Sequence, residues 1–263
     1  MNNKPNLTVL VTSCCTLKCK LCATYAPQNM NPHHYPKEIM MKCVDRFFDT
    51  MGNVKLFTMS GGEPFLHPDM LELIRYFKKW IPHMEKFEII TNGTIIPNEM
   101  ILKELGSMEK VDIMIDDYGI ELSKKVPELV KEFEKYGITH RVRKYYGEDA
   151  HLGGWLDISD FSNKNRTEKE NEELFKKCMY STTFKNHFFI IDGTAHMCYV
   201  NRKLLSAIME KEDEYVNMMD ESLSADEIKQ QLLNLRQRKH LSVCAKCNGF
   251  CVDGKRYLPA EQM

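Results

Sequence analysis

The chain has 263 residues, of which 43% are hydrophobic and 28% are charged, and this composition excludes a disordered protein. The 36 basic and 37 acidic side chains nearly cancel, so the net charge of −1 provides no overall field favouring nucleic acid or an anionic membrane. No apolar run is long enough to cross a bilayer, and residues 1–11 do not resemble a signal peptide. We therefore expect a cytoplasmic protein with no nucleic-acid partner and no membrane partner.

The first half of the chain alternates short β-rich segments with helical patterns. Strands are expected at residues 7–12, 54–59, 87–91, 111–115 and 138–142, and helices at residues 37–51, 70–81, 97–105 and 122–136. Such βα repeats predict an α/β fold with a parallel sheet, because each strand must return through a right-handed helical crossover. Five or six units form either a partial barrel or an open doubly wound sheet, and periodicity does not separate the two.

This alternation ends after Tyr146. Residues 147–166 are polar and predict a loop, and residues 169–180 predict a helix. The β-rich runs 184–191 and 194–200 flank Asp192-Gly193, which predicts a β-hairpin, and a charged helix is expected over residues 225–238. We therefore expect a barrel core over residues 1–146, a connecting loop and helix over 147–177, and a small module of hairpin and helix over 178–263.

The ten cysteines are clustered along the chain. They stand at positions 14, 15, 19 and 22, at 43, at 178 and 198, and at 244, 247 and 251. A disulfide framework is not expected in a reducing compartment, and clustered soft thiolates indicate metal sites instead. Cys43 lies alone in a helical apolar pattern and is expected in the core, and Cys14 is expected to be structural.

Two motifs follow the first two predicted strands. Cys15, Cys19 and Cys22 have the spacing C-x3-C-x2-C, and three thiolates can hold a four-iron cluster while leaving its fourth iron open to a ligand. The segment Ser60-Gly61-Gly62-Glu63-Pro64 follows the second strand, and glycine there lets the backbone approach a ligand closely. A structural zinc knuckle could use the same cysteines, but it would not predict the glycine turn after the next strand.

Together these motifs resemble those of the radical S-adenosylmethionine (radical SAM) superfamily over at least residues 7–146. The resemblance implies a partial (β/α) barrel, a [4Fe–4S] cluster on Cys15, Cys19 and Cys22, and SAM bound along Gly61, Gly62 and Glu63. It also implies an external one-electron reductant such as a flavodoxin or ferredoxin, and cleavage of SAM to a 5′-deoxyadenosyl radical that abstracts hydrogen from substrate. Leu21 departs from the pattern, because the residue before the third cysteine is often aromatic in the family.

The same resemblance points to four further SAM contacts at strand ends. Asn92 and Asp116 end the third and fourth strands, where family members often contact SAM and its ribose. Arg141 and Arg143 lie on the fifth strand, where an arginine could bind the SAM carboxylate by charge-assisted hydrogen bonds. Each has a simpler interpretation: Asn92 belongs to an Asn-Gly turn, Asp116 ends a strand, and the two arginines form a solvated face.

The C-terminal cysteines resemble the auxiliary modules called SPASM and Twitch. The opening of these modules matches the spacing Cys178-x14-Gly193-x4-Cys198 in this chain. A C-x2-C pair follows at Cys244 and Cys247. The resemblance implies a second, auxiliary [4Fe–4S] cluster on Cys178, Cys198, Cys244 and Cys247, in the shorter Twitch form. A four-thiolate zinc site remains an alternative. Cys251 is open to three roles: replacing Cys247 as ligand, packing, or donating hydrogen to a substrate radical in an epimerase.

The overall plan resembles the small Twitch-bearing aminocyclitol dehydrogenases. Few residues precede the first strand, which leaves no room for a leader-binding domain, and we therefore expect a small polar substrate such as a sugar, aminocyclitol or nucleotide-sugar. The expected reaction is a dehydrogenase-type oxidation. An epimerase, a peptide-modifying enzyme and a non-catalytic iron–sulfur protein remain alternatives. The segment 147–160, with His151, Trp155 and Asp157, either covers the substrate or is an ordinary crossover loop.

Overall fold

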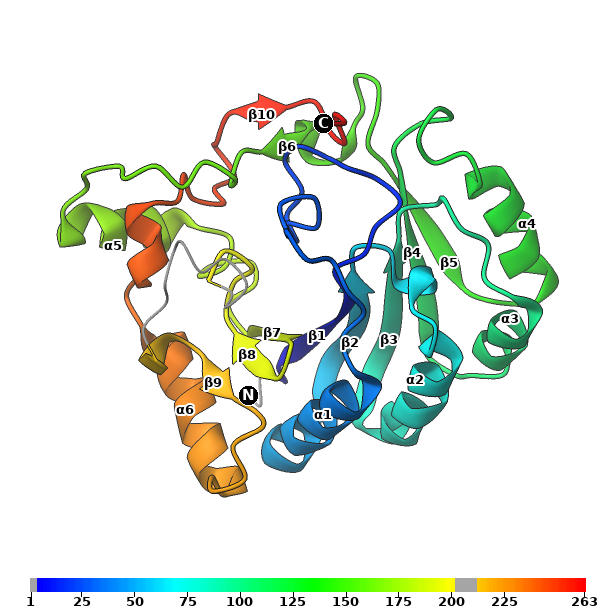
Figure 1. Cartoon of the computed structure of the whole chain (residues 1–263), viewed down its shortest axis with the longest axis horizontal. Coiled ribbons are helices and arrows are strands. Elements are labelled where there is room, and N and C mark those ends of the chain that lie inside the picture. Colours follow the sequence, from blue (N-terminus) through cyan, green and yellow to red (C-terminus); the bar gives the residue numbers. More distant parts are fainter. Residues whose placement is uncertain (1–3, 202–211) are drawn as a thin grey trace.

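A computed structural model describes residues 4–201 and 212–263 of the chain (Figure 1). Its main feature is an eight-stranded sheet in the order β5-β4-β3-β2-β1-β7-β8-β9. Strands β1 to β5 and β7 run parallel, whereas β8 and β9 are antiparallel to their neighbours. The sheet curves, and α1 to α4 follow its outer side (Figure 1). The expected α/β partial barrel is thus confirmed.

The barrel elements lie close to their predicted positions. Their bounds are β1 Asn6–Thr12, α1 Lys37–Met51, β2 Val54–Gly61, α2 Met70–Phe77, β3 Met84–Thr91, α3 Glu99–Gly106, β4 Val111–Asp117, α4 Val126–Lys135 and β5 His140–Lys144. The 3₁₀ helices Pro64–Leu66 and Lys78–His83 flank α2. The predicted helix over residues 70–81 therefore changes type at Phe77, and Pro82, which lacks a backbone N–H donor, lies within the second 3₁₀ helix.

Burial explains why these segments were recognisable. Six of the seven residues of β1 are buried, as are the first six of β4, because parallel strands are covered on both faces. Strand β5 differs, since none of its five residues is buried. It forms one edge of the sheet and carries Arg141, Arg143 and Lys144, charged side chains of the kind that blunt an open edge.

The predicted hairpin forms, but it is part of the barrel sheet. Strands β7 (His187–Ile191) and β8 (Thr194–His196) pair antiparallel across Asp192-Gly193, both of which have positive φ angles. Strand β7 also pairs in parallel with β1, with Asn6 opposite His187. The main sheet therefore continues across the expected domain boundary at residue 178, and the division into three parts stays a prediction.

The remaining elements surround the sheet. They are the 3₁₀ helix His151–Gly153, β6 Trp155–Leu156, α5 Glu168–Lys177, the 3₁₀ helix Glu212–Glu214, β9 Val216–Asn217, α6 Ala225–Gln237, the 3₁₀ helix Ser242–Ala245 and β10 Arg256–Tyr257. Helices α5 and α6 each begin with a capping box, at Thr167 and Ser224. Strand β6 pairs with β10, so the segment 147–166 is not wholly the loop that its polarity predicts. Across the described residues, no helix is long and apolar enough to span a bilayer.

Candidate active site

A cavity of about 270 Å³ lies where the carboxyl ends of the parallel strands meet. The predicted site residues that line it are Cys15, Cys19, Cys22, Gly61, Gly62, Asn92, Asp116 and Arg143. They come from the segments that end or follow β1, β2, β3, β4 and β5, which is the edge where (β/α) barrels carry their active sites. The fold thus brings eight separately predicted residues to one cavity.

The three cysteines of the first motif lie on the loop that follows β1. Each sulfur has a polar group beside it: Leu17 N and Asn92 Nδ2 lie 3.5 and 3.4 Å from Cys15 Sγ, and Thr24 Oγ1 lies 3.2 Å from Cys22 Sγ. The third, Cys19 Sγ, accepts a hydrogen bond of 3.2 Å from Gln262 Nε2. Hydrogen bonds to the sulfurs are among the features that tune an iron–sulfur cluster.

The chemistry of these three thiols fits a metal cluster. Burial raises the pKa of Cys15 to about 12 and that of Cys19 to about 11, so both are neutral thiols in the protein without a cation. Metal binding compensates for such a penalty by neutralising the thiolates, with release of protons. Three soft sulfurs that face one cavity suit iron–sulfur ligation better than they suit a hard cation.

The glycine turn after β2 packs directly against the cysteine loop. A Cβ atom on Gly62 would lie 2.0 Å from the carbonyl oxygen of Cys14, and one on Gly61 would lie 2.3 Å from that of Thr12. Gly62 N–H donates to the Thr12 carbonyl at 2.8 Å. Only glycine permits this approach, which leaves the backbone of both residues lining the cavity.

Glu63 is absent from the residues that line the cavity, and its contact with SAM stays a prediction. Its side chain is fully buried and accepts hydrogen bonds from Phe65 N–H, from the Thr91 hydroxyl and from Asn92 N–H. Burial raises the pKa of this carboxyl to about 7, against the effect of these donors. The Glu63 backbone N–H also donates to the Cys14 carbonyl at 2.8 Å. Glu63 therefore holds the ends of β2 and β3 to the cysteine loop.

The two arginines of β5 have different positions. Arg143 lines the cavity and forms a bidentate ion pair with Asp116, with Nε–Oδ1 and NH2–Oδ2 distances of 2.6 and 2.9 Å. Arg141 is absent from the lining and is ion-paired with Glu88 and Asp112. Both guanidinium groups thus already have carboxylate partners, and Arg141 lies outside the site predicted for it.

Apart from Trp155, which belongs to the segment predicted to cover the substrate, several cavity residues were not recognised from the sequence. Five aromatic side chains and one arginine contribute to the walls: Tyr118, Tyr145, Trp155, Tyr199, Phe250 and Arg256. The rings of Tyr118 and Trp155 meet edge to face with centroids 5.6 Å apart. Pairing of β6 with β10 brings Trp155 and Arg256 to the cavity, so part of the segment 147–160 does form a wall. Tyr199 and Phe250 adjoin Cys198 and Cys251, whereas Tyr118, Tyr145 and Arg256 lie in no motif and had only their aromatic or cationic character as a signal.

Arg256 differs from the other cavity arginine in its partners. Its NH2 group donates to the backbone carbonyl of Val252 at 2.7 Å. Within residues 4–201 and 212–263, no carboxylate pairs with this guanidinium. Arg256 is therefore available to an anionic ligand group, whereas Arg143 is neutralised by Asp116.

A second group of thiols lies behind one wall of the cavity. Cys178, Cys198, Cys244 and Cys247 line a small pocket whose other walls are mainly apolar and aromatic. Arg166 donates to the carbonyl oxygens of Cys244 and Cys247, and Gly249 N–H donates to Cys247 Sγ at 3.2 Å. Burial raises the pKa of Cys244 to about 12 and that of Cys247 to about 11. The four cysteines expected to hold a second cluster are thus adjacent, as neutral thiols.

Cys251 lies beside this group but outside the main cavity. It is buried, and its backbone pairs with Cys178 in an isolated antiparallel bridge. It is absent from the lining of either pocket. This position does not bring its thiol to the cavity, as hydrogen donation to a bound substrate would require. Cys43, as expected, is buried in the core, where its sulfur contacts Met219.

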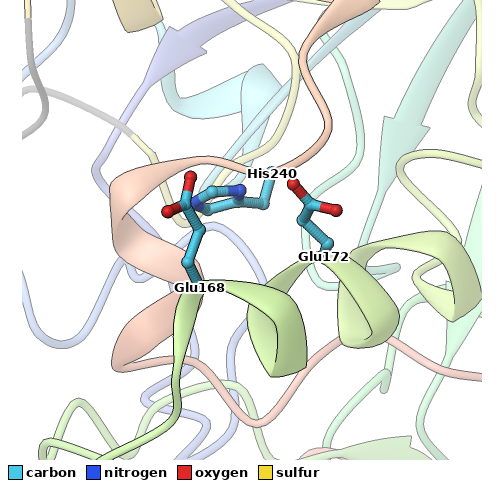
Figure 2. A group of neighbouring side chains, drawn as sticks. All are labelled: Glu168, Glu172 and His240. Carbon is cyan, nitrogen blue, oxygen red and sulfur yellow. The ribbon is translucent and has the colours of Figure 1, made fainter.

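One cluster of side chains of the types that can ligate metals was not predicted from the sequence. Glu168 and Glu172 on α5 converge with His240, and their ligand atoms all lie within 4.8 Å of one another (Figure 2). Among the described residues it is the one group of three or more that satisfies this spacing. Glu168 is exposed, and the Lys239 ammonium lies 3.9 Å from Glu172. Solvent and this ammonium satisfy the carboxylates, so we assign no ligand to the group.

The chain resembles known proteins in both sequence and structure. Residues 9–144 match the family model of the radical SAM superfamily. A probable GTP 3′,8-cyclase of Methanocaldococcus jannaschii is 28% identical over 141 residues, which is 52% of this chain and 42% of that protein. The GTP 3′,8-cyclase of Petrotoga mobilis is 25% identical over 46% of this chain and 37% of its own length. The chain thus spans less than half the length of these curated relatives.

Two solved structures align with nearly the whole chain. The structure of anSMEcpe with bound AdoMet has a TM-score of 0.56 at 15% identity and covers 97% of this chain and 93% of that one. The structure of BtrN in complex with AdoMet and 2-DOIA has a TM-score of 0.56 at 13% identity, with coverage of 97% and 98%. At these identities the likeness concerns the fold alone. The family match spans more than half of the chain, and the protein therefore belongs to the radical SAM superfamily.

Proposed function

We propose that the chain binds a [4Fe–4S] cluster through Cys15, Cys19 and Cys22, and that it oxidises a small polar substrate in a dehydrogenase-type reaction. The substrate class is a sugar, aminocyclitol or nucleotide-sugar. When bound, the first cluster supplies the electron that cleaves SAM, and a second cluster, on Cys178, Cys198, Cys244 and Cys247, accepts the electron that leaves the substrate. Oxidation of a CH–OH group to a ketone removes one hydrogen atom, one proton and one electron.

The observation that carries the proposal is the wall shared by the two thiol sites. Phe250 lines both the main cavity and the second pocket, and Tyr199 of the cavity directly follows Cys198 of the pocket. Phe250, and the backbone that joins Tyr199 to Cys198, therefore connect the cavity to the second thiol group, which supports electron transfer from a substrate to that group. An epimerase needs no electron acceptor and needs a hydrogen donor in the cavity, where Cys251 does not lie.

The absence of a tight sulfur group among the described cysteines supports an iron–sulfur cluster over zinc in the second pocket. A tetrahedral zinc site with Zn–S bonds of about 2.3 Å requires sulfur atoms about 3.8 Å apart. No three of the described cysteine sulfurs lie within 4.8 Å of one another. Four thiols around one pocket that are not drawn together this tightly suit a larger inorganic core.

The cavity walls define what the chain itself contributes. Tyr118, Tyr145 and Trp155 exclude water from one side, which protects a reactive radical from solvent. The Asp116–Arg143 pair presents fixed polar groups to hydroxyls of the ligand. Gly61 and Gly62 also present backbone atoms to the cavity. These groups orient one C–H bond of the substrate for hydrogen abstraction.

A turnover assay in deuterated water tests the reaction class. Reconstituted, reduced enzyme is incubated with SAM and a panel of aminocyclitols, sugars and nucleotide-sugars. We expect equal amounts of 5′-deoxyadenosine and of a product that has lost two hydrogens, without solvent deuterium on its carbon atoms. The variant Cys251→Ala should give the same product with its iron intact. A product of unchanged formula that carries deuterium, lost in Cys251→Ala, would identify an epimerase instead.

Arg256 is expected to bind the SAM carboxylate in place of the two predicted arginines. A charge-assisted hydrogen bond contributes about 1.5–3 kcal/mol, so Arg256→Gln should weaken SAM binding about tenfold or more. Calorimetric titration of the reconstituted protein with SAM measures this change. Arg141→Gln is the matched control and should leave SAM affinity unchanged, because Arg141 lies outside the cavity. Unchanged SAM affinity in Arg256→Gln together with a raised substrate KM would assign the guanidinium to a substrate anion.

A further inference from the structure

The segment 260–263 lies against the loop that carries the first three cysteines. Lys20 N–H donates to the Glu261 carbonyl at 2.8 Å, and Met263 N–H donates to the Lys18 carbonyl at 2.9 Å. Between these bonds, Cys19 and Gln262 face each other in an antiparallel bridge. Two stretches of chain 243 residues apart in sequence therefore form a short two-stranded contact at one proposed cluster ligand.

The side chain of Gln262 is held in one orientation. Its Oε1 atom accepts from Lys18 N–H at 2.7 Å, and its Nε2 atom donates to the Ala260 carbonyl at 2.7 Å and to Cys19 Sγ at 3.2 Å. Rotating the amide by 180° would place NH2 against the Lys18 N–H donor and Oε1 against the Ala260 acceptor. The surrounding hydrogen bonds thus determine that an N–H group, and not an oxygen, faces the sulfur.

We propose that Gln262 is a positioning residue that raises the reduction potential of the cluster at Cys15, Cys19 and Cys22. This inference rests on the proposed assignment of these cysteines as ligands. Reduction adds negative charge that is shared with the cysteine sulfurs, and an N–H donor at one sulfur stabilises the reduced form more than the oxidised form. A higher potential eases reduction by an external donor.

The position of this donor separates it from the other groups near the sulfurs. Leu17 and Thr24 belong to the cysteine loop, and Asn92 follows β3 in the barrel. Gln262 comes from the segment that follows β10, which also carries Arg256 into the cavity. The segment 252–263 therefore contributes both to the cavity wall and to the surroundings of the cluster.

Two substitutions remove the donor in different ways. Gln262→Leu deletes both polar atoms, whereas Gln262→Glu keeps the acceptor for Lys18 N–H but faces the sulfur with an oxygen that cannot donate. The reduction potential of the first cluster is measured by redox titration. The EPR signal that changes on addition of SAM is used to monitor this cluster. We expect Gln262→Leu to lower the ratio of reduced to oxidised cluster about tenfold at a fixed potential, which corresponds to a shift of about −59 mV. Gln262→Glu should shift it further in the same direction.

The control is Glu261→Gln, which removes the exposed ion pair with Lys20 but leaves Gln262 in place. It should keep the wild-type potential, and all variants should keep wild-type iron content. Loss of iron in Gln262→Leu with an unchanged potential in Gln262→Glu would show that Gln262 only ties the segment down, and would overturn the proposal. If the wild-type protein shows no SAM-sensitive signal, it is the cluster assignment itself that fails.

Discussion

Replacing Cys15, Cys19 and Cys22 together by alanine should abolish the formation of 5′-deoxyadenosine from SAM. These three thiols are the cysteine side chains on the cavity wall, and burial raises the pKa of Cys15 and Cys19, so a bound cluster is what keeps these two as thiolates. Without them no iron remains to which SAM can bind. Chromatographic measurement of 5′-deoxyadenosine after reduction with dithionite gives the result directly, and we expect a loss of at least three orders of magnitude.

The matched control for this variant is Cys14→Ala. Cys14 precedes the motif, is absent from the cavity lining, and contributes its backbone carbonyl to Glu63 N–H, which alanine retains. It should therefore keep iron content and SAM cleavage near the wild-type level. Undiminished cleavage in the triple variant would refute the assignment of all three ligands.

The second large effect concerns the iron content of the second thiol group. The fully reconstituted chain should hold about eight irons, four for each cluster. The double variant Cys244→Ala/Cys247→Ala should hold about four, because the second pocket loses two of its four sulfurs. It should still cleave SAM, since the first motif is untouched, but it should produce no oxidised substrate.

Cys251→Ala is the control for this experiment, since Cys251 adjoins the same pocket without lining it. It should retain about eight irons. If Cys251→Ala instead held about four irons, Cys251 and not Cys247 would be the fourth ligand of the second cluster. Stoichiometric zinc in the wild-type protein, together with four irons, would establish the zinc site in place of the second cluster.

The barrel was predictable because its strands carry their own signal. Apolar runs such as residues 7–12 are buried on both faces, and the turn at Asp192-Gly193 requires positive φ angles that these two residues adopt readily. The cavity residues at the strand ends were predictable for a related reason. In a parallel sheet all carboxyl ends meet at one edge, so residues that follow different strands must converge.

What the sequence did not reveal depends on contacts between distant segments. Arg143, nearer the carboxyl end of β5, reaches the cavity and pairs with Asp116, whereas Arg141 pairs with Glu88 and Asp112. Local periodicity holds no information on such pairings. The same limit applies to Arg256 and Gln262, whose neighbours lie about 100 and 243 residues away in the chain.

The central place of β1 in the sheet has a consequence for biosynthesis. One edge of β1 pairs with β2, but the other pairs with β7, and the paired residues Asn6 and His187 are 181 positions apart. At a synthesis rate of roughly 5–20 residues per second, β7 is synthesised roughly 10–35 s after β1, and the second edge of β1 is unpaired until then. Throughout that interval an apolar strand presents unpaired N–H and C=O groups, a template for aggregation. We therefore expect a shortened gene product that ends before residue 187 to leave this edge of β1 unpaired and to require chaperones to stay in solution.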